Sequence, residues 1–375
     1  MPRQRTAKPS SPSRSNRAFV PPYPPSWFDR FAAWVDRLPG PAWAFYLVFA
    51  AAVVLAATAI QWREDAYPVG TLNPLHVWTL GLFGFLPGLM HYLDKSATSA
   101  IASIRPLLVP QNAVDRVSLE DQSTFNTLSY QLTTLPPRAT LMATVSGAAL
   151  GAVLNVLPIV TGAAPSSFPG TAGTTFSNAS VLTLFILQSA LWGVFVYHTI
   201  HQLVLISRIY TQHARINIYD LQPLYALSLP GAFTGIGILF MLYLSMALGG
   251  TPQAVDPVAI GLAGAMAAIA GATFALPLAG AHRRLVQEKD RRLAEAASRF
   301  EAAAEELHRQ LDGRRLSHMD SLTKALTGLE IEVGVLRRIP TWPWQPGAVR
   351  GVFAALFLPL AIWALQLLLG RFLGT

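Results

Sequence analysis

The stretch that decides the fold is PVAIGLAGAMAAIAGATFALPLAGA (257–281), which runs directly into HRRLVQEKDRRLAEAASRFEAAAEELHRQLD (282–312). The first part carries no charge and is long enough to cross about 30 Å of hydrocarbon as a helix. The second part is rich in Ala, Glu and Arg and contains neither Pro nor Gly, so the same helix is expected to continue into water. A membrane helix that becomes a cytoplasmic helix predicts an all-α membrane protein.

The composition of the whole chain supports this placement. Of the 375 residues, 52% are hydrophobic and only 13% are charged, whereas soluble domains have about 25% charged residues. The chain has no cysteine, which excludes disulfides, thiolate metal sites and cysteine nucleophiles. The sequence contains no phosphate loop, dinucleotide-binding glycine motif, nucleophile elbow or metal-hydrolase motif, so no enzyme is predicted. The net charge of +8 lies in particular loops, which favours lipid headgroups over nucleic acid as the partner.

Seven stretches of about 20 residues are apolar enough to be membrane spans. They are 42–62, 75–93, 139–161, 180–206, 228–249, 257–281 and 349–369. None has Asp, Glu or Lys at its centre, and Arg350 at the start of the seventh can extend toward the headgroups. The lack of a buried charge argues against an ion-coupled transporter. It leaves a channel open, because pores can be lined by small polar groups and gated by apolar rings.

The distribution of Lys and Arg predicts the orientation. If the N-terminus is cytoplasmic, the inner segments hold 26 of the 28 Lys and Arg, and the outer segments hold only Arg63 and Arg371. Those inner segments are 1–41, 91–140, 203–230 and 282–350. Because cytoplasmic loops carry the excess of positive charge, we expect a seven-transmembrane helical bundle with its N-terminus in and its C-terminus out.

The first 40 residues are expected to form two segments that precede the membrane domain. Residues 1–25 are basic and rich in Ser and Pro, which is typical of a disordered tail. Residues 26–40 place aromatic and apolar side chains at helical spacing, and Ser26 can cap this amphipathic helix. The helix either lies in the inner-leaflet interface or packs on the cytoplasmic part of the protein. Spans one to six then occupy 41–281.

Residues 282–339 are expected to form a cytoplasmic helical hairpin between spans six and seven. Apolar residues recur every three or four positions on both sides of Gly313, which breaks the helix. Two alternatives follow, since the apolar stripes either cover each other or also meet the hairpins of other subunits. The assembly candidates are Phe300, Ala304, Leu307, Leu311, Leu329 and Val333.

The last segment, 340–375, combines a Pro/Trp elbow with span seven. The prolines of PTWPWQPG exclude a regular helix, and its tryptophans are typical of a membrane interface. The segment is either a stiff elbow that transmits motion or a plain aromatic anchor. In span seven, Gln366 is the candidate for contacting an ion and Leu356 for an apolar gate. The pore-lining candidates that share one face are Val352, Leu356, Pro359, Trp363 and Gln366.

Three histidines are candidates for binding a metal or haem. His198 and His201 lie one turn apart in the fourth span, and His91 lies at the inner end of the second. No carboxylate or cysteine accompanies them within a span, and no HExxH motif is present. The alternative is that they hydrogen-bond to neighbouring helices and headgroups, and no resident cofactor is predicted.

Two resemblances bear on function. PTWPWQPGAVR (340–350) and SRIYTQHARINIYDLQPLYALS (207–228) resemble segments of uncharacterised bacterial polytopic membrane proteins, which implies a bacterial inner membrane. The architecture is similar to that of the insect odorant and gustatory receptor channels. That similarity implies a homo-oligomer, with a tetramer favoured, that is held by cytoplasmic helices and has the last span along the pore. It also implies a small-molecule ligand as a possible partner.

Three functions follow from these observations. The first is an oligomeric seven-span ion-channel subunit, possibly ligand-gated, with span seven lining the pore. The alternative is a membrane sensor or scaffold that recruits a partner through its cytoplasmic hairpin. The second alternative is a haem- or metal-binding membrane protein, for which the three histidines are the candidate ligands.

Overall fold

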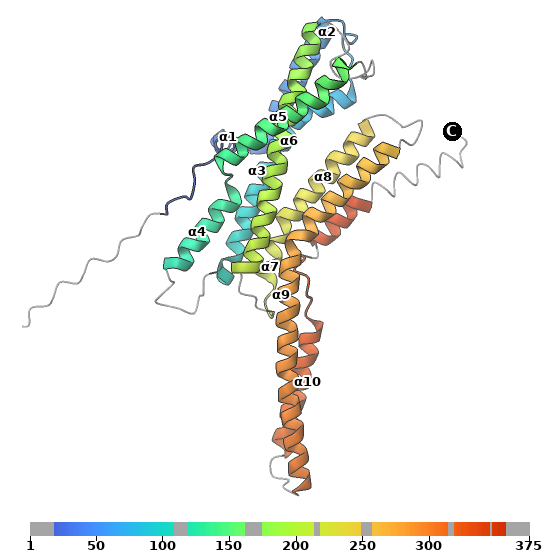
Figure 1. The fold of residues 1–375 in the computed structure, drawn as a ribbon. Helices are drawn as coiled ribbons and strands as arrows, with labels where there is room; N and C mark the ends of the chain where they lie inside the picture. The colour runs from blue at the N-terminus through green and yellow to red at the C-terminus, as the bar shows by residue number, and fades with distance from the viewer. Residues whose placement is uncertain are drawn as a thin grey trace, which may run out of the picture.

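The computed structural model describes residues 19–108, 119–161, 175–213, 218–248, 257–313, 319–345 and 347–357. Every regular element in these ranges is helical (Figure 1), so the prediction of an all-α protein is confirmed for them. The elements are α1 (Trp27–Val35), α2 (Ala42–Arg63), α3 (Pro74–Leu108), α4 (Leu119–Thr133), α5 (Pro137–Val160), α6 (Thr175–Arg208), the π-helix η1 (Ile209–His213), α7 (Gln222–Ala226), α8 (Ser228–Leu248), α9 (Pro257–Asp312) and α10 (Met319–Arg338). A further helix covers Gly347–Phe357.

Five helical stretches in the described part of the chain are long and apolar enough to cross a membrane. They overlap the first, third, fourth, fifth and sixth predicted spans, and the chain is therefore a helical membrane protein. The stretches are Ala42–Arg63, Gln122–Val160, Asn178–Gln212, Gln222–Ala247 and Ala263–Asp312.

The second and seventh predicted spans are not among these five. The second lies in α3, where His76, Trp78, Pro87 and several glycines lower the mean hydropathy. The described part of the seventh is the helix Gly347–Phe357, which is too short to cross a bilayer by itself. The rest of that span, 358–375, lies outside the described residues, so the count of seven spans stays a prediction.

The helix α3 occupies the middle of the bundle. It contacts α2, α6 and α8, and its C-terminal half also packs against α4 and α7. On either side of it, α5 packs on α6, and α8 packs on α9. The helix α9 then leaves the bundle and pairs with α10 to form a long stalk at one end of the molecule (Figure 1).

The pair α5 and α6 packs backbone to backbone. A Cβ atom added to Gly193 would lie 2.2 Å from the carbonyl oxygen of Ala143, and one added to Gly147 would lie 2.5 Å from that of Ser189. Small residues allow this approach between membrane helices. The similar stripe that begins at Gly264 in α9 has no such neighbour, because a Cβ there would meet nothing within 4 Å.

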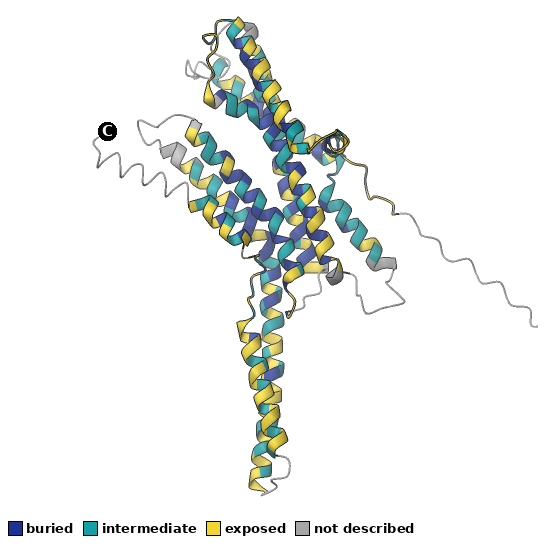
Figure 2. Cartoon of the chain, turned by 180° about the vertical axis from the view of Figure 1, so that it is seen from behind, coloured by how far each residue is buried: buried dark blue, intermediate teal, exposed yellow. Residues whose placement is uncertain are grey.

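The outward faces of α2 and α5 are covered with large apolar side chains that no described residue buries (Figure 2). A patch of this length would be unfavourable in water, whereas hydrocarbon accepts it. On α5 these side chains are Leu141, Met142, Val145, Leu150, Val153, Leu154, Leu157 and Val160. Their positions agree with a helix that faces lipid along most of its length.

Candidate functional site

The N-terminal helix α1 begins at a complete capping box. The Ser26 hydroxyl accepts a hydrogen bond from the Asp29 amide at 3.3 Å, and the Asp29 carboxylate accepts one from the Ser26 amide at 2.8 Å. One face of α1 is buried in the bundle through Phe28 and Val35, while Trp34 on another face is exposed. The helix thus packs on the helical bundle and still presents an aromatic side chain to its surroundings.

The same Asp29 carboxylate ties α1 to the connection between α4 and α5. Its Oδ2 atom also accepts a hydrogen bond from the Leu135 amide at 3.0 Å. Burial raises the pKa of Asp29, and its hydrogen bonds with Ser26 and Leu135 partly offset that effect. Nearby, the Tyr23 hydroxyl donates to the Thr134 carbonyl at 2.7 Å. The segment before α1 is therefore fastened to the bundle at two adjacent points.

A second carboxylate, Asp36, lies just after α1 and joins it to α3. Its oxygens lie 2.7 Å from Lys95 Nζ and 3.1 Å from His91 Nε2. The Nδ1 atom of His91 is 2.9 Å from the Tyr46 hydroxyl of α2. Partial burial alone would raise the pKa of Asp36, but the contacts with Lys95 and His91 outweigh it and hold the pKa below its usual value.

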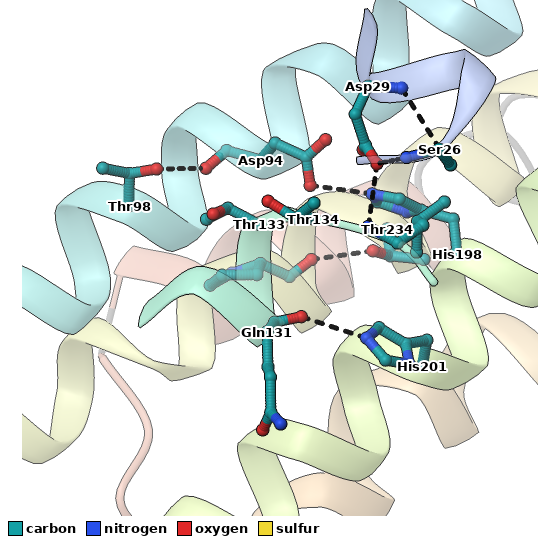
Figure 3. A network of polar contacts seen from close by, with 12 residues as sticks. Ser26, Asp29, Asp94, Thr98, Gln131, Thr133, Thr134, His198, His201 and Thr234 are labelled. Atoms are coloured by element: carbon teal, nitrogen blue, oxygen red, sulfur yellow. Dashed lines mark hydrogen bonds and ion pairs between the residues drawn. The ribbon is translucent and has the colours of Figure 1, made fainter. Parts of the chain in front are cut away.

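The third carboxylate, Asp94, pairs with a histidine far away in the sequence. Its Oδ1 atom lies 2.8 Å from His198 Nε2, with side chains that are 17% and 2% exposed (Figure 3). Phe28 of α1 lies edge-on to the His198 ring, with a centroid distance of 6.4 Å. A search for acidic partners within one span misses this pair, because Asp94 directly follows the second predicted span. One sequence feature points to Asp94: it lies one helical turn after His91, so the two polar side chains share a face of α3.

The three histidines have three separate sets of partners. The Nε2 atom of His201 lies 3.0 Å from the Gln131 carbonyl oxygen at the end of α4 (Figure 3). His91 is held by Asp36 and Tyr46, and His198 by Asp94. Within the described part of the chain, no group of three or more His, Cys, Asp or Glu is placed to hold a metal ion. The geometry therefore favours polar linkers between helices over a shared ligand set.

The buried face of α6 is unusually polar. Gln188, Thr199 and Gln202 are each less than a tenth exposed, and their side chains have polar atoms without a hydrogen-bond partner among the described residues. The Nδ1 atom of His198 belongs to the same group. Each such atom costs about 1–3 kcal/mol when left unpaired, and polar groups inside membrane bundles are usually functional. Thr199 and Gln202 thus lie close to the Asp94–His198 pair along α6, whereas Gln188 is separated from it by the buried Val194 and Phe195.

The pore-lining candidates that can be placed face the bundle of their own chain. Val352 is only 7% exposed, Leu356 is half-buried, and the Tyr243 hydroxyl of α8 donates to the Leu356 carbonyl at 2.7 Å. The outward side of this helix carries Phe353 and Phe357, which stack on each other and are both 53% exposed. Pro359, Trp363 and Gln366 lie outside the described residues.

The hairpin helices cover each other along part of their apolar stripes. Ala304 and Leu307 of α9 and Leu329 and Val333 of α10 are half-buried, while Phe300 and Leu311 are exposed. Two further apolar side chains are exposed on α10, at Ile331 and Val335. Beyond its base the stalk is largely open to its surroundings (Figure 2). Mutual packing of the two helices therefore leaves apolar side chains available on both of them.

The Pro/Trp elbow is attached to α9. The Trp342 ring stacks on His282 with a centroid distance of 4.0 Å, and Trp344 packs against Phe274 at 5.5 Å. Lys289 Nζ donates to the carbonyls of Arg337 and Ile339, both at 2.8 Å, and so caps the end of α10. These contacts attach the segment between α10 and the helix Gly347–Phe357 to α9.

No protein-family model, curated protein or solved structure matches the chain. The arrangement of its own residues is therefore what bears on function.

Proposed function

We propose that the chain is a seven-span membrane protein, N-terminus in and C-terminus out, that works as a sensor or scaffold through its cytoplasmic hairpin. The proposed orientation places 26 of the 28 Lys and Arg on the cytoplasmic side. It also places the polar contacts of α1, the elbow and the stalk on the same side of the bilayer. The bacterial inner membrane is the proposed location.

The observation that carries this proposal is the continuity of α9. Its 56 residues run from the outer end of a membrane span to the tip of the stalk without a break. A tilt of the membrane part moves the tip, because a helix transmits such motion over its length. The elbow then returns the chain to the membrane through contacts with His282 and Lys289 on the same helix.

The stalk supplies the surface for recruitment or assembly. Phe300 and Leu311 on α9, and Ile331 and Val335 on α10, are exposed although the segment is not expected to lie in lipid. Exposed apolar side chains on a cytoplasmic helix pair favour association with a second helical surface. We propose that this surface joins copies of the chain, as the architectural similarity also implies.

The proposed association is tested by placing a charge on the exposed surface. Phe300→Glu and Ile331→Glu should convert the purified oligomer to monomers, because a charge at a packed apolar contact is strongly unfavourable. Thr327→Glu is a matched control, since Thr327 is an exposed polar residue of the same stalk. Native mass spectrometry in detergent gives the mass. A wild-type monomer, or an oligomer that survives both charges, would exclude assembly through the hairpin.

The orientation is tested by reporter fusions. Fusions after Gly173 and Thr375 should report the outside, and fusions after Asp121 and Gly313 should report the cytoplasm. Reporter activity on intact cells distinguishes the two sides. An outside signal at Gly313 would contradict both the orientation and the span count.

The ion-channel subunit is the second candidate function, and one observation favours it. The two stacked rings of Phe353 and Phe357 face away from the bundle, on a helix attached directly to the stalk. If stalks meet around an axis, this apolar face is well placed to close a pore by dewetting. In bilayer recordings Phe357→Ser should then raise the basal current. Leu356→Ser should raise it instead if the pore is lined by the face that the sequence predicts, which contains Val352 and Leu356. Silence of both variants would exclude the channel.

A further inference from the structure

A polar groove lies between the inner halves of α4 and α6. It has a volume of about 290 Å³ and is open on one side. Its floor is apolar, because Leu128 and Leu205 are buried. Its walls carry hydroxyl, amide and guanidinium groups. The groove is lined by Ser123, Thr124, Thr127, Leu128, Gln131, Leu205, Arg208 and Gln212.

The groove has the chemistry of an anion site. Arg208 is its cation and is exposed. None of the described lining residues is acidic, and no ion pair to Arg208 occurs within the described ranges. Ser123, Thr124 and Thr127 of α4 line the same groove as this guanidinium, with the Thr127 hydroxyl donating to the Ser123 carbonyl at 2.8 Å. The side chains of Gln131 and Gln212 add amide groups to the lining. A guanidinium next to several neutral donors is suited to a phosphate group.

An apolar track leads along α6 to the same place. Val196, Ile200 and Val204 are all exposed and follow one another at intervals of one turn. The next position in this series is Arg208. The same helix therefore offers hydrocarbon contacts on its membrane part and a cation where that part ends. This is the arrangement that a molecule with an acyl chain and an anionic headgroup requires.

We propose that this groove binds the phosphate headgroup of an anionic phospholipid, with an acyl chain along the exposed track of α6. In the proposed orientation the lipid belongs to the inner leaflet, and this assignment to a leaflet rests on the proposed function. Bound there, the lipid bridges α4 and α6. One polar contact already joins the two helices, because the Nε2 atom of His201 on α6 lies 3.0 Å from the carbonyl oxygen of Gln131 on α4.

A second groove provides an internal comparison. It has a volume of about 330 Å³, lies between α3 and the α7–α8 region, and contains Lys95 with several serines. The charge of Lys95 is already compensated, because its Nζ atom is 2.7 Å from Asp36. The first groove is therefore better suited to bind an anionic headgroup than the second.

The test uses the full chain purified in a neutral detergent. Phosphatidylglycerol or phosphatidylcholine is added, and native mass spectrometry counts the bound lipids. We expect phosphatidylglycerol to bind about tenfold more tightly, and Arg208→Gln to remove that preference. Arg105→Gln is the matched control, because Arg105 is an exposed inner-side cation outside this groove, above the Phe125 ring. Equal binding of both lipids, or an equal loss with both variants, would overturn the proposal.

Two further arms separate a lipid from a free anion. Val204→Ser should weaken phosphatidylglycerol several-fold if an acyl chain uses the track, and inorganic phosphate should compete only weakly. If phosphate competes fully and Val204→Ser has no effect, the site is a simple anion site. Thr127→Val probes the groove without changing charge, and the melting temperature of each variant without lipid shows whether it is folded. Lipid binding in detergent does not depend on the orientation of the protein in the membrane. A failure of the lipid experiment therefore contradicts the lipid site, whereas a failure of the reporter fusions contradicts the proposed orientation.

Discussion

His198 Nε2 on α6 lies 2.8 Å from the Asp94 carboxylate on α3, and the Phe28 ring of α1 stands edge-on against the same histidine. Three elements that are remote in the sequence therefore meet at one buried aspartate–histidine contact. The pair lies next to the buried polar residues Thr199 and Gln202 of α6 and beside the attachment of the N-terminal segment.

The first prediction concerns that pair. Asp94→Asn should lower the free energy of unfolding by about 1.5–3 kcal/mol, because the buried imidazole loses a charged hydrogen-bond partner. Thermal unfolding in detergent measures the change. Thr98→Ala is the control. The Thr98 hydroxyl donates to the main-chain carbonyl of Asp94, so this change removes a neighbouring hydrogen bond and leaves the Asp94 carboxylate in place. Equal melting temperatures for wild type and Asp94→Asn would show that the pair does not stabilise the bundle.

The second prediction concerns pH and Asp36. Its pKa is below the usual value in the folded protein, so its contribution to stability is present above the unfolded pKa of about 3.9 and is lost as pH falls through the folded pKa. Because the carboxylate is 45% exposed, the contribution should be no more than about 1 kcal/mol. Protease protection of α1 in wild type and Asp36→Asn should differ near neutral pH and converge once the pH lies below the folded pKa of Asp36. A difference that stays constant would contradict the role of ionised Asp36.

The third prediction compares two glycines. Gly193→Ala should destabilise the protein by about 1–3 kcal/mol, because the added methyl group would meet the backbone of α5 at 2.2 Å. Gly264→Ala adds the same methyl group where nothing lies within 4 Å, and should be neutral or stabilising by up to about 1 kcal/mol. Unfolding in detergent gives both values. The same loss in both variants would mean that α9 is also closely packed at Gly264.

The fourth prediction concerns the joint between stalk and elbow. Lys289→Met removes two hydrogen bonds to the end of α10, both at 2.8 Å, and should cost about 1–2 kcal/mol of local stability. Hydrogen exchange at the last turn of α10 should become faster by about tenfold or more. Lys324→Met is the control, because it removes only an exposed pair with Asp320 worth about 0.3–0.5 kcal/mol. If hydrogen exchange at that turn is unchanged in Lys289→Met, Lys289 does not stabilise the end of α10.

The sequence determined the helices and their ends where local signals were strong. The stretch 257–312 forms one helix with the predicted bounds, and Gly313 follows its last residue. The absence of Pro and Gly after the span, together with a length far above one turn, makes a break unfavourable whatever the neighbours are. Ser26 likewise predicted the start of α1, because its hydroxyl and Asp29 complete a local motif.

Only the tertiary structure decided which faces meet. Gly147 and Gly264 each belong to a series of small residues spaced by four, yet Gly147 is packed against another helix and Gly264 is not. Val352 is buried against its own chain, and Asp94 contacts His198, which is 104 residues away in the sequence. In a membrane, lipid and protein interiors are equally apolar, so hydrophobic periodicity marks a helix without saying which of its faces is covered. That choice depends on shape and on the pairing of polar atoms between helices, which come together only when the bundle forms.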